Sequence, residues 1–404
     1  MIHKFSVSNL RSIREKVVLD LRIPNTAPDL PRFRRSIANP KLRLPTVVVL
    51  MGANGSGKTA LLDALVTAAR VAGRTVPSEP DIAPIAMLTP FFSNACAGEP
   101  TEFCLEFEGN WLAPNKPPEL FRYEVVVERK PWEHRSERFR SEALSYFPKG
   151  RPRRLFERSV PNGHIYSSGE FGVTSRDPRL KAVRSDASVI ATLAQLNVPV
   201  AMRLANWLSA LGALTNIMHY VDIRLPIRGV ADLFQNVPKL SDWFSERIQC
   251  SDLGISGFDV IGSGDEKTLS FSHDGIDVPI ILHFESSGTK RLVKILPLLY
   301  KGLAEGIPAV FDEIDGDLHV DIVIEILNWF SSRETNPQNS QLFVTSHNVG
   351  LLDELEKEEL FIVEKSRDGA TRLHGAQDVK GLRRDVRLYP KYRVGVLGGV
   401  PRVG

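Results

Sequence analysis

The 404-residue chain has few cysteines and no long apolar run. Its three cysteines, Cys96, Cys104 and Cys250, are odd in number and show no C-x-x-C spacing, which argues against a disulfide framework and a structural zinc site. We expect them to be small buried apolar residues. No stretch approaches the roughly 18 to 20 apolar residues that span a membrane, and the first residues lack the apolar core of a secretory signal. The sequence therefore predicts a cytoplasmic protein without a membrane partner.

Charge of one sign is not in large excess either. The formal net charge is +3, with 25% charged and 43% hydrophobic residues. This balance by itself predicts neither nucleic acid nor membrane as a partner, so only local basic clusters can support such a hypothesis. The length is sufficient for two or three structural units with a substantial core.

A glycine-rich segment carries the strongest motif. Residues 52–59, GANGSGKT, match G-x-x-x-x-G-K-[ST] at every fixed position. The apolar run 47–50 before them predicts a buried strand, and residues 60–65 after them predict a helix that begins at the loop. In this setting backbone N–H groups and the helix N-terminus bind phosphate oxygens. The predicted phosphate-binding residues are Gly52, Asn54, Gly55, Ser56, Gly57, Lys58, Thr59 and Ala60.

Two side chains of this loop have more specific predicted roles. Lys58 would reach the β- and γ-phosphates, and the Thr59 hydroxyl would help to hold Mg²⁺. The predicted cofactors are therefore ATP and Mg²⁺.

A pair of carboxylates ends the short apolar strand predicted at 308–311. Nucleotide hydrolysis needs two carboxylates because their tasks differ. Asp312 would hold the Mg²⁺ shell, whereas Glu313 would polarise the water that attacks the γ-phosphate. Taken alone, the pair is equally typical of a strand that ends in acidic surface residues.

A histidine follows another predicted strand, at 341–344. Because ligands bind at the carboxyl ends of strands in open α/β sheets, His347 would contact the γ-phosphate and steady the attacking water. A lone histidine is usually structural. The order of glycine loop, acidic strand end and histidine strand end favours the catalytic role.

The segment 285–291, ESSGTKR, lies between a strand predicted at 280–284 and an apolar-striped helix through residues 292–303. Serine and glycine at a helix start leave backbone donors uncovered, and the helix dipole adds positive potential. A simple N-cap explains Ser286 equally well. The local sequence leaves the two readings open.

The order of these four motifs resembles the ABC-type ATPase superfamily, in the non-transporter branch with the SMC proteins, RecF and the OLD-family ATPases. Within that branch the chain looks most like bacterial abortive-infection ATPases, through 285–289, ESSGT, and 311–319, FDEIDGDLH. The resemblance implies an α/β ABC-type ATPase head, a P-loop NTPase, with an antiparallel β lobe and a helical insertion.

The resemblance also implies domain bounds. Residues 1–175 would form an ATPase lobe with the P-loop and the antiparallel section, and 176–250 would form the helical insertion. Residues 251–404 would form an ATPase lobe with the signature, Walker B, D-loop and H-loop.

Further roles come only with the resemblance. Ser286 and Gly288 would be the signature that completes the ATP site of a second protomer, which implies a homodimer. Residues 314–319 would be the D-loop at the dimer seam, and Arg11 would approach the phosphates. The chain departs from the family where Thr289 replaces the usual glutamine. No glutamine occurs between 71 and 110, so residues 91–94 would hold the place of the Q-loop without its Mg²⁺ ligand. We therefore expect slow hydrolysis.

Two functions follow from this reading. The first is an ATP-binding and hydrolysing dimerising switch in antiviral, abortive-infection defence, partnered with an effector protein encoded nearby. The second is a DNA-repair or DNA-clamp ATPase of the RecF or SMC type, which would make nucleic acid a partner. Solvated surface charge explains basic clusters more often than nucleic-acid binding does. The clusters that would neutralise phosphates in this second function are Arg151, Arg153 and Arg154, and Arg383 and Arg384.

The predicted insertion carries two apolar helical stripes, in 204–214 and in 230–244. Such stripes usually form core, and the alternative is that part of this surface joins a second protomer or an effector.

Overall fold

The computed structural model describes residues 1–73, 88–128, 138–217, 227–249 and 254–400. Its centre is a five-stranded sheet in which every pair of neighbouring strands is parallel except the last. The strand before the glycine-rich loop lies in the middle, so that loop and the acidic and histidine strand ends share one edge. The strands, in spatial order, are β14 (Ala309–Phe311), β15 (Leu342–Thr345), β5 (Val47–Met51), β16 (Leu360–Lys365) and β17 (Thr371–Gly375).

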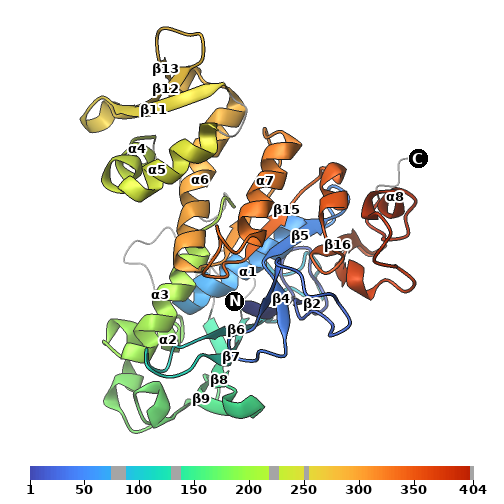
Figure 1. Ribbon diagram of the computed structural model, residues 1–404. Helices are drawn as coiled ribbons and strands as arrows, with labels where there is room; N and C mark the ends of the chain where they lie inside the picture. The colour runs from blue at the N-terminus through green and yellow to red at the C-terminus, as the bar shows by residue number, and fades with distance from the viewer. Residues whose placement is uncertain (74–87, 129–137, 218–226, 250–253, 401–404) are drawn as a thin grey trace.

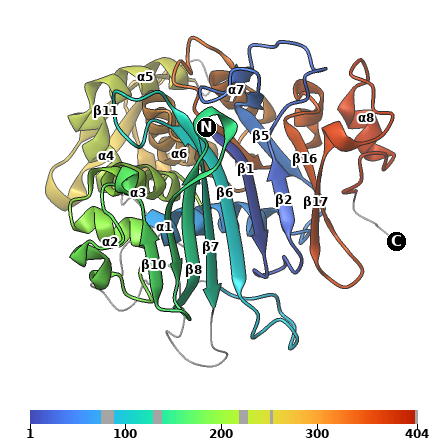
Figure 2. The ribbon, with the colours of Figure 1, turned by 90° about the horizontal axis from the view of Figure 1, so that it is seen from below.

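A seven-stranded antiparallel sheet forms the second layer (Figure 2). Its edge strand β2 packs against β17, so the two sheets adjoin at this side. The predicted α/β fold with an antiparallel lobe is thereby confirmed. The strands, in spatial order, are β10 (His164–Ser167), β9 (Arg153–Ser159), β8 (Arg138–Tyr146), β7 (Glu119–Glu128), β6 (Thr101–Gly109), β1 (Ile2–Ser8) and β2 (Val17–Asp20).

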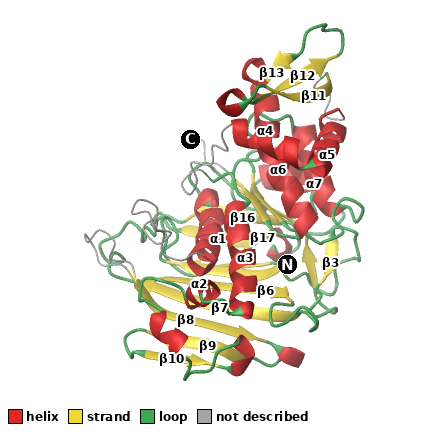
Figure 3. Ribbon diagram, turned by 90° about the vertical axis from the view of Figure 1, so that its left-hand side faces the viewer, coloured by secondary structure: helices red, strands yellow, loops and turns green. Residues whose placement is uncertain are grey.

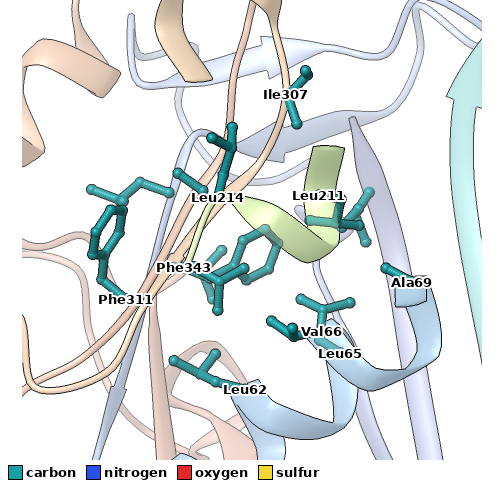
Figure 4. Packing of buried hydrophobic residues seen from close by; sticks show 14 of the residues in the cluster. Leu62, Leu65, Val66, Ala69, Leu211, Leu214, Ile307, Phe311 and Phe343 are labelled. Atoms are coloured by element: carbon teal, nitrogen blue, oxygen red, sulfur yellow. The ribbon is translucent and has the colours of Figure 1, made fainter. Parts of the chain in front are cut away.

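The helix after the glycine-rich loop, α1 (Lys58–Gly73), is buried along nearly its whole length. It packs against α2 (Val189–Gln195) and α3 (Pro199–Ala213), and the three helices lie over one face of the antiparallel sheet (Figure 3). Leu62, Leu65 and Val66 of α1 lie in one apolar cluster with Phe343 of β15 and Leu211 of α3 (Figure 4). This core holds the start of α1 rigidly at the edge of the central sheet.

The chain leaving α3 extends the central sheet by one short segment. Thr215 forms a parallel bridge with Val310 of β14, and the Val310 N–H donates to the Leu214 carbonyl over 2.8 Å. The residue after this bridge, Asn216, thus lies beside the end of β14. The segment that follows α3 is therefore part of the nucleotide edge.

A separate lobe stands on the start of α6 (Ser287–Glu305), a long helix that runs from the lobe into the body (Figure 1). Helices α4 (Ile227–Asn236) and α5 (Pro238–Gln249) pack on α6 and on a small antiparallel sheet. That sheet contains β11 (Ile255–Ile261), β12 (Thr268–His273) and β13 (Ile280–Ile281). The strand predicted over 280–284 is shorter than expected, because residues 282–284 turn into a 3₁₀ helix before α6.

The two apolar stripes of residues 176–250 pack in different places. Leu204, Leu208 and Leu211 of α3 are buried against the body, whereas Phe234 and Phe244 are buried in the lobe, where both ring centroids lie within 5.2 Å of that of Phe258. The stripes are therefore core, and they do not pack on each other. The described residues of this region give no support to an apolar partner surface there.

Four further strands and helices surround the central sheet. Strands β3 (Phe33–Arg35) and β4 (Arg43–Pro45) pair with each other, α7 (Val320–Ser331) packs against β5, and α8 (Leu388–Arg393) packs against residues 349–354. Cys96 and Cys104 are half-buried rather than buried as predicted, and Cys250 lies outside the described residues. Burial raises the pKa of the Cys104 thiol to about 11. No helix in the described ranges is long and apolar enough to cross a membrane.

Candidate nucleotide-binding site

The glycine-rich loop passes between β5 and α1 under tight steric limits. A Cβ on Gly52 would lie 2.0 Å from the Val363 carbonyl oxygen, and one on Gly57 would lie 2.0 Å from the Thr371 hydroxyl. Gly57 also has a φ of +108°, which favours glycine. The Thr371 hydroxyl itself donates to the Ser56 carbonyl at 3.0 Å. These two glycines are therefore required for the loop to lie this close to β16 and β17.

Lys58 begins α1, and its side chain folds back over the loop. Its ammonium donates to the carbonyl of Gly52 at 2.8 Å and to that of Ala53 at 3.2 Å. Burial lowers the pKa of Lys58, an effect opposed by the carboxylates of Asp312, Glu313 and Asp315. The ammonium is thus held by weak neutral acceptors within the field of three carboxylates. Phosphate oxygens are stronger acceptors for it, because charge-assisted hydrogen bonds are about twice as strong as neutral ones.

Asp312 lies at the centre of a hydrogen-bond network that joins two of the motifs. The Thr59 hydroxyl donates to its Oδ2 at 2.8 Å, and the Thr345 hydroxyl donates to its Oδ1 at 2.6 Å. Both carboxylate oxygens are therefore oriented by side chains from the neighbouring elements α1 and β15. These bonds fix the carboxylate of Asp312 beside the hydroxyl of Thr59. The carboxylate and the hydroxyl are the two groups predicted to hold the metal.

Asn216 is a site residue that the sequence reading missed. Its amide donates to the Asp312 carbonyl at 2.7 Å, and its Oδ1 accepts the Asp312 N–H at 2.7 Å. The side chain thus pairs with both backbone groups of the residue. No motif marks Asn216 because its position depends on the bridge between Thr215 and Val310.

The stretch 91–94, predicted to take the Q-loop place, does not line the cavity between the motifs. The Phe91 N–H donates to Asn9 at 3.0 Å, and the Phe92 side chain is exposed. The amide that bonds to the backbone of Asp312 comes from Asn216, which does not line the cavity either.

Glu313 stands next to Asp312 with a positive φ of +47°, an uncommon conformation for a non-glycine residue. Its N–H donates to the Thr345 hydroxyl at 2.7 Å, and its carbonyl accepts from the guanidinium of Arg291. The side chain remains 64% exposed and lies 3.8 Å from Nε2 of His347. The backbone is thus pinned while the carboxylate is free to meet water and imidazole.

His347 is positioned from β15 through its backbone. Its N–H donates to the Asp315 carboxylate at 3.1 Å. Two predicted catalytic side chains, those of Glu313 and His347, therefore face each other, although they lie 34 residues apart in the chain.

Arg11, in the turn after β1, forms an ion pair of 2.5 Å with the buried Asp63 of α1. Its backbone is also left-handed, with a φ of +50°. The pair keeps the guanidinium alongside the first turns of α1, at the wall of the cavity.

A cavity of about 610 Å³ lies between these groups. All predicted phosphate-binding loop residues except Gly52 line it, and Arg11 joins them. The remaining lining residues are Ser12, Asp312, Glu313, Asp315, Gly316 and His347. The separated motifs therefore meet around one space of nucleotide size.

Ser286 and Gly288 lie outside this cavity. Ser286 is the N-cap of α6, and its Oγ accepts the Thr289 N–H at 3.1 Å, so the N-cap reading describes its local bond. The Ser286 side chain is nonetheless exposed. A Cβ on Gly288 would lie 2.9 Å from the Asp317 carbonyl oxygen. The start of α6 thus packs on residues 315–317 of the same chain and presents its serine to solvent.

The donor set fits Mg²⁺. Among the described residues, no three histidine, cysteine or acidic side chains come together in a way that would hold a metal ion by themselves. Mg²⁺ is usually bound by one or two carboxylates together with substrate phosphates and water, and a hydroxyl next to Asp312 suits this pattern. Three carboxylates beside the loop would also repel a nucleotide unless a divalent cation balanced them.

The family model described as "AAA domain, putative AbiEii toxin, Type IV TA system" matches residues 47–353, which include every motif of the cavity after Arg11. No curated protein matches the chain in sequence.

Solved structures similar to the chain include SMC heads. An SmcHead bound to the C-winged helix domain of ScpA matches with a TM-score of 0.48 and 15% identity, over 92% of this chain and 97% of that one. The SMC head domain from Thermotoga maritima gives 0.42 and 16%, over 93% and 98%. An Smc head domain with an extended coiled coil, derived from Pyrococcus furiosus, gives 0.46 and 16%, over 97% and 98%.

Proposed function

Because the chain belongs to this AAA-domain family, we propose that it binds and hydrolyses ATP as a switch in which two copies close over the nucleotide. The observation that carries the proposal is the network through which Thr59 and Thr345 orient the two oxygens of Asp312 beside Lys58. Such positioning is the main requirement of phosphoryl transfer, which otherwise depends on electrostatic stabilisation.

Each residue has a distinct role in this proposal. The ammonium of Lys58 exchanges its bonds to Gly52 and Ala53 for the β- and γ-phosphates. Thr59 and Asp312 hold Mg²⁺, which when bound neutralises charge on the phosphate oxygens.

The reacting water would be handled by the facing pair. Glu313 accepts a proton from the attacking water, and the imidazole of His347 contacts the γ-phosphate and keeps the carboxylate in place. Asn216 and Thr345 act on the position of Asp312 and Glu313 and do not touch the nucleotide.

The proposal includes a second copy because Ser286 and Gly288, the predicted signature, do not line the cavity of their own chain. Ser286 is exposed at the start of α6, where backbone donors and the helix dipole favour an anion. We propose that it faces the γ-phosphate held by a partner. The nucleotide state would then control the separation of two protomers, which is the two-state element that a switch needs.

The biological setting we propose is abortive-infection defence, with a separate effector protein encoded nearby. The description of the family supports this setting, because it names a toxin and a type IV toxin–antitoxin system. ATP-dependent closure would change the surface offered to the effector.

The DNA-clamp alternative receives less support. Arg154 lies 3.6 Å from Glu124 and 3.3 Å from Glu157, and Arg384 lies 2.8 Å from Glu356. These basic clusters are thus partly neutralised by neighbouring acids, which lowers their attraction for phosphates.

Sedimentation with Mg-ATP tests the proposal. Glu313→Gln should trap a closed dimer, because nucleotide is bound and not hydrolysed. The double variant Ser286→Arg with Glu313→Gln should bind ATP as a monomer, since a long cation at the N-cap blocks the approach of the partner. Ser332→Arg with Glu313→Gln, an alteration at the far end of α7, is the control and should still close.

The assignment of the signature is wrong if the Ser286→Arg double variant closes as well as Glu313→Gln alone. For the biological setting, phage plaque counts on cells carrying the chain with its neighbouring genes are informative. Protection that persists with Lys58→Ala would remove the ATP switch from the defence.

A further inference from the structure

The turn of the lobe hairpin, residues 274–279 between β12 and β13, has an unusual surface. All six of its residues are exposed, and they include two apolar side chains, Ile276 at 50% and Val278 at 72%. Asp274 precedes these apolar residues and Asp277 lies between them, and no ion pair engages either aspartate within the described ranges. We call residues 274–279 the lobe turn. Exposed apolar residues that lie next to one another mark interaction sites more often than single scattered ones do.

The lobe turn lies on the signature side of the molecule. Strand β13 leads through residues 282–284 directly into the start of α6, and Phe284 in this link is 74% exposed. Figure 1 shows the hairpin at the far end of the lobe from the body. A partner that meets Ser286 and extends along the lobe would therefore also meet the lobe turn.

A second cavity, of about 750 Å³, lies on the other side of the glycine-rich loop. Residues 53–56 of the loop form one wall, and the end of β16 with the turn toward β17 forms another. Gly399 and the partly buried Val400 give it a small apolar part. We call it the β16 cavity.

Charge in the β16 cavity is mainly positive once internal bonds are counted. Of its two carboxylates, Glu364 accepts the Gly399 N–H at 2.6 Å, and Asp368 lies 3.3 Å from Arg14 and accepts from the Ser366 hydroxyl. The cavity also contains three exposed cations, which form no ion pair with any described residue, namely Lys365, Arg367 and Arg372.

We propose that the lobe turn of one copy docks in the β16 cavity of a second copy. The proposal rests on the proposed function, in which Ser286 of one copy faces the loop of the other. In a two-fold dimer the contact between two complementary surfaces forms twice, once in each direction. If the signature of one copy faces the glycine-rich loop of the other, the surface beside the signature then faces the surface beside the loop. The lobe turn and the β16 cavity hold these positions, and Figure 1 shows the lobe and the β16–α8 region on opposite sides of the body.

The chemistry of the two surfaces is complementary. Asp274 and Asp277 would face the three cations, and Ile276 and Val278 would pack against the partly buried Val400. Charge complementarity of this kind chooses the partner surface and its register more than it adds affinity. The contact would also touch residues 53–56, so docking would report on the conformation of the loop that binds the nucleotide.

Cysteine cross-linking between two chains tests the contact itself. Tagged Val278→Cys and untagged Arg367→Cys chains, both with Glu313→Gln, are mixed and oxidised with and without Mg-ATP. A tagged–untagged disulfide dimer should form with Mg-ATP and be at least about fivefold weaker without it. Tyr166→Cys, on the outer strand of the antiparallel sheet, replaces Val278→Cys in the matched control, and chains with only the native cysteines set the background.

Charge reversal tests its energetics. Asp274→Lys with Asp277→Lys, or Arg367→Glu with Arg372→Glu, should each weaken ATP-dependent dimerisation of the Glu313→Gln protein on the order of 10-fold, because like charges then face each other. All four changes in one chain should restore most of the affinity. ATP binding by each monomer is measured to show that the folds are intact.

The outcomes separate the two hypotheses. If Glu313→Gln itself does not dimerise with Mg-ATP, the proposed function and this contact both fail. If it dimerises and the reversed variants dimerise equally well, with no cross-link from Val278→Cys, only the docking proposal is wrong. A third result would also overturn it: the cavity reversal removes salt-sensitive DNA binding and leaves the dimer unchanged, which would make the cavity a nucleic-acid surface.

Discussion

The nucleotide edge and the signature end of the same molecule differ in how far their polar groups are already engaged. At the nucleotide edge, Asp312 is bonded by Thr59, Thr345 and Asn216, and Lys58 by two carbonyls. At the signature end, Ser286, Phe284 and the lobe turn are exposed. The first region is organised within one chain, whereas the second presents groups that another chain would engage.

This difference teaches where control would reside. A preorganised half-site binds nucleotide without large rearrangement, so binding alone does not report on a partner. The exposed half adds its contacts only when two copies meet. Variants at the nucleotide edge should therefore change what a single chain does with ATP, and variants at the signature end should weaken association while ATP binding by the monomer stays intact.

The largest expected effect comes from Lys58. Lys58→Ala removes the cation that would bridge the phosphates, and the loss of two or more charge-assisted hydrogen bonds should weaken ATP binding by about 100-fold or more. Calorimetry of the monomer measures this. Lys301→Ala, an exposed lysine on α6, should bind like the wild type. Equal affinity of the two variants would contradict the assignment of the first cavity.

Glu313→Gln should separate binding from chemistry. Its amide cannot accept the proton of the attacking water, so turnover should fall by roughly 10² to 10⁴ while the ATP affinity changes little. Single-turnover hydrolysis and nucleotide binding are measured on the same preparation. Glu334→Gln, an exposed glutamate elsewhere, serves as the control. Turnover that survives in Glu313→Gln would exclude Glu313 as the base.

Asn216→Ala should have an intermediate effect. It leaves the N–H and the carbonyl of Asp312 without their partners, which should lower the free energy of unfolding by about 1 to 3 kcal/mol and displace the metal-binding carboxylate. We expect the Mg²⁺ concentration needed for half-maximal turnover to rise about 10-fold, since positioning residues of this kind typically change metal affinity by 10 to 100-fold. Asn328→Ala, exposed on α7, is the matched control. An unchanged Mg²⁺ requirement would show that Asn216 is only structural.

The smallest expected effect concerns Glu359, which belongs neither to the nucleotide edge nor to the signature end. It therefore serves as a reference for the comparison of these two regions. Burial raises the pKa of Glu359 to about 7, an effect opposed by Arg32, whose guanidinium lies 2.8 Å away. The folded protein therefore holds this proton more tightly than the unfolded chain does, so the associated stability is complete below pH ~4.5 and is lost as the pH rises toward 7. Glu359→Gln should remove this component from the melting temperature measured between pH 4.5 and 7.5. A variant with the same pH profile as the wild type would show that Glu359 stays ionised.

Several features of the fold and the site could be predicted from local sequence. The loop 52–59 needs glycine where its backbone passes close to β16 and β17, and its motif is therefore contiguous. Asp312, Glu313 and His347 each follow a short apolar strand, so their common location follows from the rule that parallel strands end at one edge. The α/β class with an antiparallel lobe was predictable through the family resemblance that these motifs carry.

Other features depended on contacts between distant segments, and only the tertiary structure decided them. Asn216 carries no motif, and it reaches Asp312 because the chain after α3 adds to the edge of β14, 96 residues away. The apolar stripes at 204–214 and 230–244 gave no indication of which would cover α1 and which would cover the lobe. Likewise, Asp274 and Arg367 look like ordinary surface charges in the sequence. What the sequence by itself determined was the chemistry of the nucleotide edge, because one local backbone path or strand end specifies each group there; which distant side chains support that edge, and which surfaces stay exposed, depended on packing that no local pattern encodes.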